Sequence, residues 1–277
     1  MTDDSDYEYR DLVASTWDLM RGDTSAWPDR DFFRSAIRNS GEPVLDVGCS
    51  TGRLLLDYLA DGIQVDGVDI SPEMIEICRQ KALEQSLQPA LYVQAIETLD
   101  IPRKYRTIII PSSSFQLVPD LQDARSALER FHDHLLPGGL LVFSIWHTKR
   151  AGPAEWSDWY LIAEKERPED GKTIRRQERS MYDPETELRH TENRYEVLEN
   201  DQVVYSEEHR RSPELRNYTV TQISQLLEQA GYGEIKAVSG YSDDPATDED
   251  GSFCVMAWRA GGAGGLRGGG ETYRRND

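Results

Sequence analysis

Short apolar runs alternate with helix-like segments between residues 43 and 146. Three segments have apolar residues at helical spacing, namely Leu54–Leu59, Pro72–Leu83 and Leu121–Leu135, and Ser71 is placed to cap the second. Between them lie runs in which apolar residues are nearly continuous: Val44–Val47, Val65–Asp69, Ala90–Gln94, Tyr105–Ile110 and Leu140–Trp146. Such runs are typical of strands buried on both faces. The pattern predicts an α/β fold, with a parallel sheet covered by helices on both sides.

The pattern changes after residue 146 and returns near residue 219. Trp156, Trp159 and Tyr160 have the spacing of one helix face, which predicts a short helix. Three β-like runs with turn-like connections then predict an antiparallel β-meander: Thr173–Tyr182, Leu188–Leu198 and Val203–Arg210. A helix and two strands complete the α/β pattern: Thr219–Ala230, Gly233–Ser239 and Phe253–Trp258.

We therefore expect one α/β core with three additions. Helix-like segments over Tyr9–Met20 and after Pro28 predict an N-terminal helical cap at residues 1–40. The core is expected at 41–150 and 213–260, with the meander inserted between these parts as a lid at 151–212. Residues 261–277 are so rich in glycine that they cannot bury a core, and we expect a disordered tail there.

Composition and charge exclude several function classes. Lys and Arg number 31 against 50 Asp and Glu, and the net charge of −19 disfavours binding to nucleic acids and anionic membranes, whose phosphates would be repelled. Three cysteines are too few for a disulfide framework. The acidic N-terminus lacks the apolar stretch of a signal peptide, and no run approaches the roughly 18 apolar residues of a membrane span. A cytoplasmic protein is expected.

The candidate chemistry begins at the end of the first strand. Residues 44–53, VLDVGCSTGR, have the pattern of a strand, a tight glycine turn and a helix start, whose free N–H groups suit a negative group. Asp69 ends the second strand 23 residues after Asp46, where an acidic residue typically binds ribose hydroxyls. These features together predict a cofactor that contains adenosine.

The glycine spacing separates the possible adenosine cofactors. Gly48 and Gly52 have the spacing G-x-x-x-G, whereas nicotinamide and flavin sites use G-x-G-x-x-G, and the Gly-Lys-Ser/Thr of a P-loop is absent. The carboxylate of Asp46 suits an ammonium group better than a phosphate. The spacing therefore disfavours both dinucleotides and nucleoside triphosphates.

Four motifs in order resemble those of class I S-adenosylmethionine-dependent methyltransferases. They are Asp46–Gly52, Val68–Met74, Leu136–Val142 at the turn into the fifth strand, and Leu215–Tyr232 around the last helix. The resemblance covers roughly residues 9 to 259, and four ordered motifs are far more specific than one. It implies a Rossmann-like, mostly parallel sheet of seven strands with a reversed last strand, and S-adenosyl-L-methionine as the cofactor.

The resemblance also assigns cofactor contacts. Ile70 and Met74 would flank the adenine, with core packing as the alternative, and Arg53 would pair with the cofactor carboxylate, with a solvated helix arginine as the alternative. The full expected set is Asp46, Gly48, Cys49, Gly52, Arg53, Asp69, Ile70, Met74, Ile96, Glu97 and Ser112.

The chain departs from the family pattern at two positions. Ser50 replaces the usual middle glycine, and serine is small enough to be tolerated. Ile96 stands where the family often has an acidic residue near the adenine amino group. We expect Glu97 or backbone groups to take over that contact.

The methyl acceptor is expected beside the ends of the fourth and fifth strands. Residues 111–116, PSSSFQ, lack the Asn/Asp-Pro-Pro-Tyr/Phe motif of nucleic-acid amino methyltransferases, in agreement with the negative charge. His147 follows the fifth strand and is either a general base for an oxygen nucleophile or a surface histidine. Further candidate acceptor contacts, with core packing as the alternative for the aromatic ones, are Tyr9, Trp17, Ser113, Phe115 and Trp156.

These observations favour an enzyme that methylates an N or O atom of a small molecule by direct in-line displacement. Histidines and carboxylates show no metal-ligand spacing, and the cysteines form no cluster, so we expect no metal. The protein would be a monomer or a homodimer. A non-catalytic S-adenosylmethionine-binding or regulatory protein of the same fold is the main alternative, and an NAD(P)-dependent oxidoreductase is disfavoured by the glycine spacing.

Overall fold

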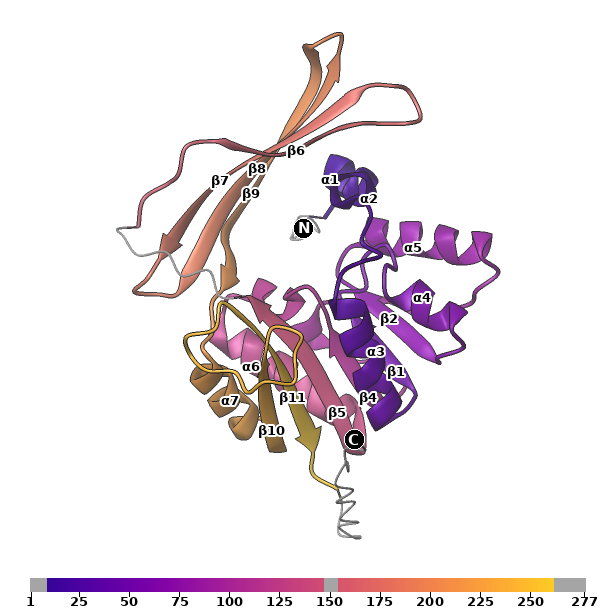
Figure 1. The fold of residues 1–277 in the computed structure, drawn as a ribbon, viewed down its shortest axis with the longest axis vertical. Coiled ribbons are helices and arrows are strands. Elements are labelled where there is room, and N and C mark those ends of the chain that lie inside the picture. The colour runs from indigo at the N-terminus through magenta and orange to yellow at the C-terminus, as the bar shows by residue number, and fades with distance from the viewer. Residues whose placement is uncertain (1–8, 147–153, 262–277) are drawn as a thin grey trace, which may run out of the picture.

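The main sheet forms the lower half of the molecule in the view of Figure 1. In the computed structural model, which describes residues 9–146 and 154–261, its seven strands have the order β10-β11-β5-β4-β1-β2-β3. Neighbouring strands are parallel except at β11, which is antiparallel to both β10 and β5. The expected sheet with a reversed last strand is thereby confirmed. The strands are β1 (Val44–Val47), β2 (Val65–Asp69), β3 (Leu91–Val93), β4 (Tyr105–Ile110), β5 (Leu135–Trp146), β10 (Tyr232–Ser239) and β11 (Ser252–Arg259).

Helices cover both faces of this sheet. One layer contains α3 (Asp29–Ser40), α4 (Leu55–Ala60) and α5 (Pro72–Glu84). The opposite layer contains α6 (Leu121–His134) and α7 (Val220–Gln229). Two short 3₁₀ helices, η1 (Ile96–Thr98) and η2 (Ser114–Leu117), follow β3 and β4 at the carboxyl edge of the sheet.

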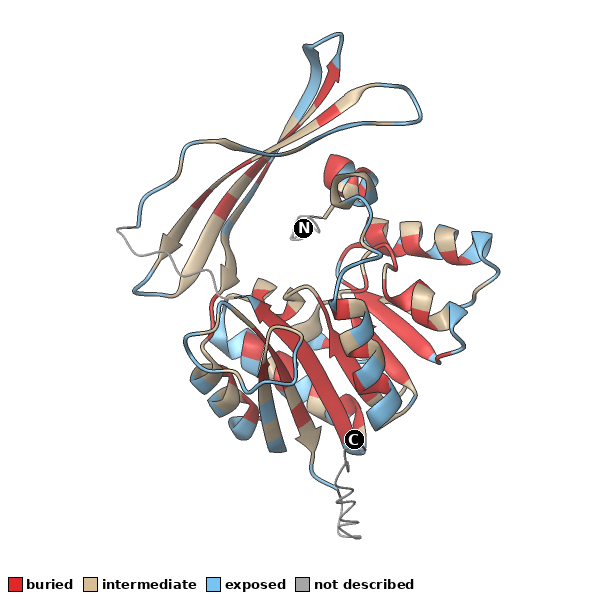
Figure 2. Ribbon diagram, in the orientation of Figure 1, coloured by how far each residue is buried: buried red, intermediate tan, exposed pale blue. Residues whose placement is uncertain are grey.

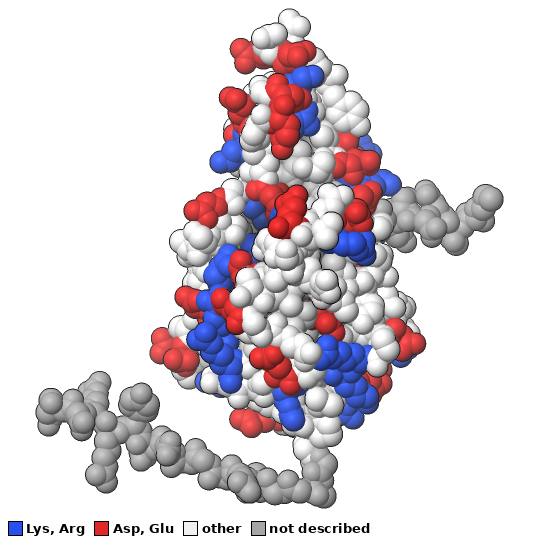
Figure 3. All heavy atoms as spheres, turned by 90° about the vertical axis from the view of Figure 1, so that its right-hand side faces the viewer, with Lys and Arg blue, Asp and Glu red and all other residues white. Residues whose placement is uncertain are grey.

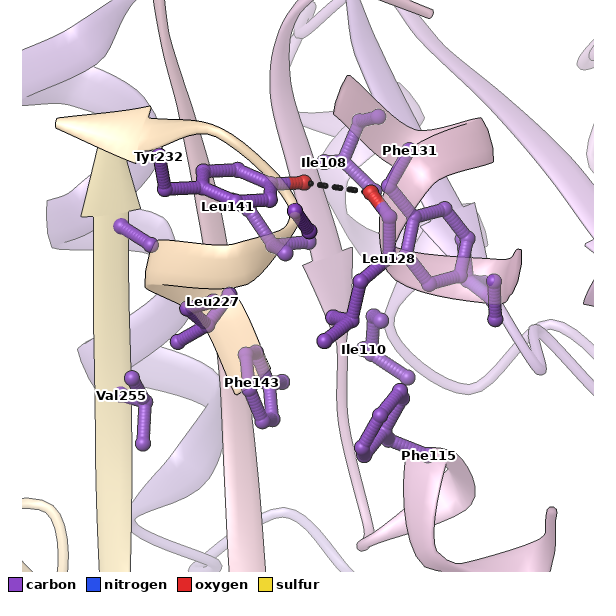
Figure 4. Close-up of a cluster of buried hydrophobic side chains, with 14 of the residues drawn as sticks. Ile108, Ile110, Phe115, Leu128, Phe131, Leu141, Phe143, Leu227, Tyr232 and Val255 are labelled. Carbon is purple, nitrogen blue, oxygen red and sulfur yellow. Dashed lines mark hydrogen bonds between the residues drawn. The ribbon is translucent and has the colours of Figure 1, made fainter. Parts of the chain in front are cut away.

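Alternate residues of β4 enter opposite halves of the core. Ile108 and Ile110 join the cluster beneath α6 and α7, whereas Ile109 joins the cluster beneath α3 to α5. Figure 4 shows part of the first cluster, where the Tyr232 hydroxyl donates to the carbonyl oxygen of Leu128 at 3.1 Å. Because both faces of the central strands are buried (Figure 2), these strands read as nearly unbroken apolar runs in the sequence.

Side-chain caps fix the beginnings of three helices. The Ser71 hydroxyl accepts the N–H of Met74 at 3.1 Å with Pro72 at the first helical position, which confirms the expected start of α5. Asp120 caps α6 in the same way. Thr219 and Gln222 form a reciprocal capping box at the start of α7. These caps satisfy N–H groups that a helix cannot pair internally.

A separate antiparallel sheet forms the upper left of the view in Figure 1. Its strand order is β6-β7-β8-β9, and it confirms the expected meander inserted between β5 and α7. It contains one strand more than the pattern predicted. The strands are β6 (Tyr160–Glu166), β7 (Thr173–Asp183), β8 (Leu188–Glu199) and β9 (Gln202–Arg216), and we call this sheet the lid.

The short helix expected from Trp156, Trp159 and Tyr160 is wrong. Residues 154–159 are irregular, and β6 begins at Tyr160. The guanidinium of Arg179 lies 5.2 Å from both indole centroids, so the tryptophans pack on a sheet arginine instead of forming a helix stripe. Ser157 donates its N–H to the Ser180 carbonyl at 2.9 Å, which ties this segment to β7.

The N-terminal segment lies between the lid and the main sheet. The single helix expected over Tyr9–Met20 consists of two short ones, α1 (Asp11–Ser15) and α2 (Trp17–Arg21), separated at Thr16. Leu12 and Val13 pack against Ile174, Tyr195 and Val197 of the lid. This apolar contact joins the N-terminal helices to the inserted sheet.

The surface mixes charges of both signs. On the face in Figure 3, acidic side chains lie among Lys and Arg and do not form one block. No helix of the described residues is long and apolar enough to cross a membrane. The expected glycine-rich tail lies almost wholly outside the described residues.

Candidate functional site

A cavity of about 320 Å³ opens at the carboxyl ends of β1, β2 and β4. Its wall includes residues of the glycine turn, of the segments after β2 and β3, of the loop after β4, of α2 and of the lid. Expected site residues that line it are Tyr9, Trp17, Asp46, Gly48, Cys49, Arg53, Asp69, Ile70, Met74, Ile96, Glu97 and Ser112. The fold therefore brings twelve separately predicted residues to one space.

The turn after β1 has a backbone that only glycine accommodates at one position. Gly48 has φ +68°, and a Cβ built there would lie 2.7 Å from the Ser114 Oγ atom. Such an approach is closer than nonbonded atoms allow, so any side chain would displace the loop after β4. Gly52 lies behind the turn, against Cys78 and Leu56, and supports its shape without lining the cavity.

The carboxylate of Asp69 is held at the cavity wall by backbone donors. Its Oδ2 accepts the N–H of Ser50 and its Oδ1 accepts the N–H of Ser71, both at 2.9 Å. Burial raises the pKa of Asp69, and these N–H groups oppose that shift because they favour the charged form. Because the N–H of Ile70 also bonds to this carboxylate, and a carboxylate offers about four lone-pair positions, about one acceptor position remains for a ligand.

Asp46 presents a buried carboxyl with an unmet oxygen. The residue is 2% exposed, and its Oδ1 has no hydrogen-bond partner among the described residues. Burial raises the pKa of Asp46 to about 8, while the charge of Arg53 opposes the shift. An oxygen without a partner costs free energy that a bound donor would recover. A cationic donor such as an ammonium group fits this position.

Arg53, which is expected to pair with the cofactor carboxylate, already binds a carboxylate of the protein. Its guanidinium makes two hydrogen bonds to the Asp29 carboxylate, one of them from Nη1 to Oδ1 at 3.1 Å. It also lies 5.0 Å from the ring centroid of Trp27. Arg53 lines the cavity, but a buried carboxylate already takes its strongest donors.

The adenine end expected from the sequence is bounded by apolar side chains. Ile70, Met74 and Ile96 line this part of the cavity, together with the carboxyl-bearing Glu97. The Ser50 hydroxyl donates to the Met74 sulfur at 3.4 Å, which ties the glycine turn to α5. The combination of apolar walls and one carboxylate can hold an aromatic base with an amino group.

Several expected acceptor contacts lie elsewhere. Phe115 is a core residue, fully buried against Phe143 and Tyr218 at ring distances of 5.3 and 5.7 Å, because η2 turns its side chain away from the cavity. Trp156 lies on the lid beside Arg179. Ser113 has a left-handed backbone, does not line the cavity, and donates its N–H to the Ser144 hydroxyl at 3.2 Å. His147 lies outside the described residues.

The structure adds wall residues that were not among the expected contacts, although Val47 and Ser50 lie within the first motif. They are Arg21, Val47, Ser50, Leu54, Ala95, Pro111, Ser114, Leu117, Val118, Pro119, Asp123 and Arg211. One signal for Arg21 was available, because it stands four residues after Trp17 and shares its helix face. Arg211 could not be found from local pattern, since β9 brings it to the cavity from the inserted lid.

One glutamine joins the lid to the loop beside the cavity. Gln116 accepts the N–H of Trp146 at 2.7 Å and donates to the carbonyls of Trp146 and Arg216 at 3.0 and 2.9 Å. Arg211 donates to the Leu117 carbonyl at 2.8 Å from the same side. These bonds fix where the lid leaves and rejoins the core. No group of three or more metal-binding side chains gathers anywhere in the described ranges.

Comparison with known proteins agrees with this geometry. Residues 44–139 match the model of the methyltransferase domain family. The chain is 38% identical over 109 residues to the aklanonic acid methyltransferase DauC of Streptomyces sp. (strain C5), which covers 38% of this chain and 48% of that protein. The chain thus spans about half the length of the curated relatives it matches.

Solved structures show the same fold over most of the chain. An S-adenosylmethionine-dependent methyltransferase from Clostridium acetobutylicum ATCC 824 has a TM-score of 0.71 and 20% identity, and the match covers 90% of this chain and 98% of that one. The sugar N-methyltransferase KedS8 from Streptoalloteichus sp. ATCC 53650 has a TM-score of 0.68 and 20% identity over 94% and 99% of the two chains. The likeness extends to the lid as well as the sheet.

Proposed function

We infer that this chain, whose residues 44–139 form a methyltransferase domain of the class I S-adenosylmethionine-dependent type, transfers a methyl group to an N or O atom of a small-molecule acceptor. The observation that carries this proposal is the cavity, which continues from Asp46 and Asp69 to the N-terminal helices and the lid. A site for the cofactor alone would not need walls from the lid.

The described residues fit S-adenosylmethionine. Asp46 would accept the ammonium group, because its buried Oδ1 lacks a partner. Asp69 would accept a ribose hydroxyl through its remaining acceptor position. The adenine would lie among Ile70, Met74 and Ile96, with Glu97 accepting its amino group. Backbone groups of Gly48 and Cys49 and the side chain of Ser112 would complete the set.

The protein's own contribution is position and the exclusion of water. When bound, S-adenosylmethionine supplies a methyl group activated by its sulfonium, so that a C–N or C–O bond forms as the C–S bond breaks and S-adenosylhomocysteine leaves. Trp17 and Tyr9 cover one side of the cavity, and Arg211 reaches it from the lid. Holding the acceptor in line within a dry site supplies most of the rate that such a reaction needs.

The nature of the acceptor follows from charge and relatives. A chain of net charge −19 would repel the phosphates of nucleic acids, so we place the acceptor among small molecules. Relatives of the domain include one named for aklanonic acid, and a neighbour of the same fold is named a sugar N-methyltransferase. An amine acceptor needs only to be neutral and aimed, whereas an oxygen acceptor needs a base, for which His147 is the candidate. We propose that the protein acts in the cytoplasm as a monomer or homodimer.

Two measurements test this function. Calorimetry should give micromolar binding of S-adenosylhomocysteine and none of NAD(P)H, and Asp69→Ala should lose that binding; unchanged affinity in the variant would reject the ribose assignment. A screen of metabolite extracts with methyl-labelled S-adenosylmethionine should then give a labelled product. A ligand-bound structure with no space beside the sulfonium would argue for a binding protein without catalysis.

A further inference from the structure

Arg21 brings a guanidinium to the cavity, where Asp18 and Asp29 act on it electrostatically but no carboxylate of the described residues forms an ion pair with it. It is the last residue of α2 and lies 4.6 Å from the Trp17 ring centroid and 5.5 Å from that of Trp27. It makes no hydrogen bond or ion pair to any residue in the described ranges. Two aromatic rings therefore hold the group in place while its five N–H donors have no acceptor.

The surroundings of Arg21 disfavour its positive charge. Burial and, after it, the nearby charge of Arg53 lower the pKa of Arg21 to about 10, although Tyr9, Asp29 and Asp18 oppose the shift. Stacking on indole rings compensates part of this cost but satisfies no N–H donor. A guanidinium in such a place gains most from an anion that accepts two of its donors at once, as a carboxylate does.

Arg53 is not free for that task. Its two Nη atoms already bind the Asp29 carboxylate, and both of these side chains are nearly or fully buried. Arg53 acts electrostatically on both Asp46 and Arg21, so the three groups lie at the same end of the cavity. Among the described residues, that end holds one carboxyl oxygen without a hydrogen-bond partner and one guanidinium without an ion-pair partner, which is the complement of an amino-acid zwitterion.

We propose that Arg21, rather than Arg53, binds the carboxylate at the amino-acid end of the cofactor and so selects S-adenosylmethionine over adenosine thioethers that lack it. The inference rests on the proposed function. Arg53 then acts as a positioning residue, which Asp29 holds beneath the site. Since Arg21 belongs to α2, the cofactor carboxylate would also fix the helix that covers the cavity.

The test compares two ligands that differ at the amino-acid end. S-adenosylhomocysteine carries the carboxylate and ammonium, whereas 5′-methylthioadenosine keeps the adenosine and the thioether but lacks both. Calorimetry with the full-length chain should show that Arg21→Ala lowers the affinity for S-adenosylhomocysteine by about 10- to 100-fold. The same variant should change the affinity for 5′-methylthioadenosine by less than about threefold. Arg21→Lys, which keeps the charge and loses the planar fork, should recover only part of the affinity.

Controls separate this role from a packing role. Arg125, which donates to Gln229, is exposed and does not line the cavity, so Arg125→Ala should leave both affinities unchanged. An equal loss for both ligands in Arg21→Ala would show that the arginine only holds Trp17 and Trp27, and would overturn the proposal. No loss for either ligand would overturn it as well, as would a selective loss in Arg53→Ala alone. Failure of the wild-type protein to bind S-adenosylhomocysteine would instead reject the proposed function.

Discussion

The hydroxyl of Thr51, in the turn after β1, donates to Oδ1 of Asp18 on α2 at 2.7 Å. The other oxygen of Asp18 pairs with the Lys81 ammonium of α5 at 2.5 Å. Thr51 is fully buried, so the N-terminal helix is joined directly to the turn that forms the cavity floor. One carboxylate thus links three elements that are far apart in the sequence.

This link predicts coupling between the two residues. Asp18→Ala and Thr51→Val should each lower stability, and the double variant should lose less than the sum because the bond is already broken in either single variant. A coupling of about 1 kcal/mol is expected for such a bond. Urea unfolding of the four proteins measures it. Additive losses would mean that the bond contributes nothing in solution.

Gly48 should tolerate no side chain. A left-handed backbone costs an alanine about 1–2 kcal/mol, and the clash with Ser114 adds about 1–3 kcal/mol. Gly171 is a matched control, because its φ is also +68° and a Cβ there meets nothing within 4 Å. We expect Gly48→Ala to lose more stability than Gly171→Ala in urea unfolding, and to lose S-adenosylhomocysteine binding as well. Equal losses would show that Ser114 can move away from the added Cβ at little cost.

The ionisation of Asp46 should lower the free energy of unfolding in alkaline solution. Its pKa is raised to about 8 in the folded protein against about 3.9 in an unfolded chain. The folded state binds the proton more tightly, so this contribution to stability is complete below about pH 4 and is lost as the pH rises through about 8. The stability of Asp46→Asn relative to wild type should therefore be higher at pH 8 than at pH 5. Urea unfolding at both values checks this, and a pH-independent difference would contradict it.

The same carboxyl should make ligand binding depend on pH. An ammonium group binds the ionised form of Asp46, so the affinity for S-adenosylhomocysteine should rise between about pH 6.5 and 8.5. Asp46→Asn should bind at least about tenfold more weakly and lose this dependence. Calorimetry at several pH values gives both quantities. A wild-type profile that the variant reproduces would assign the titration to another group.

Glu207 should hold the N-terminal helices to the lid. Its Oε1 accepts the N–H of Leu12 at 2.8 Å and lies 2.9 Å from Nε2 of His209. Glu207→Ala should expose the Leu12 amide and speed its hydrogen exchange, whereas Glu207→Gln keeps an accepting oxygen and should stay close to wild type. Exchange measured by NMR resolves this one amide. Slow exchange in both variants would place the anchor in the apolar packing of Leu12 and Val13.

Local pattern is sufficient to predict a strand that is buried on both faces, because its apolar residues are nearly continuous. Tyr105–Ile110 was placed with its observed bounds because the strand is buried on both sides. The start of β5 was placed five residues late, since Leu135 pairs with Tyr105 before an irregularity that contains Pro137 and two glycines. A bulge of this kind leaves no periodic signal.

The sequence predicts those site residues whose positions depend on a single local motif. Asp46, Gly48 and Asp69 act through a turn that the sequence encodes locally, and all three line the cavity. Partners brought from a distance could not be seen: the engagement of Arg53 by Asp29 depends on how α3 packs. The sequence predicts Phe115 at the acceptor because it belongs to the same loop as Ser112 and Ser114, which line the cavity, but the direction of η2 places its side chain in the core.

The hydrogen bonds from Gln116 to Trp146 and Arg216 have an evolutionary consequence. The two points where the inserted sheet departs and returns lie within reach of one side-chain amide. To the core, the insertion is a closed loop with a negligible span between its ends, and such loops vary in length and sequence at little cost to the rest of a fold. Under the proposed function, new acceptor preferences can therefore arise by exchanging this module, while the core that would bind the amino-acid and nucleoside parts of the cofactor stays as it is.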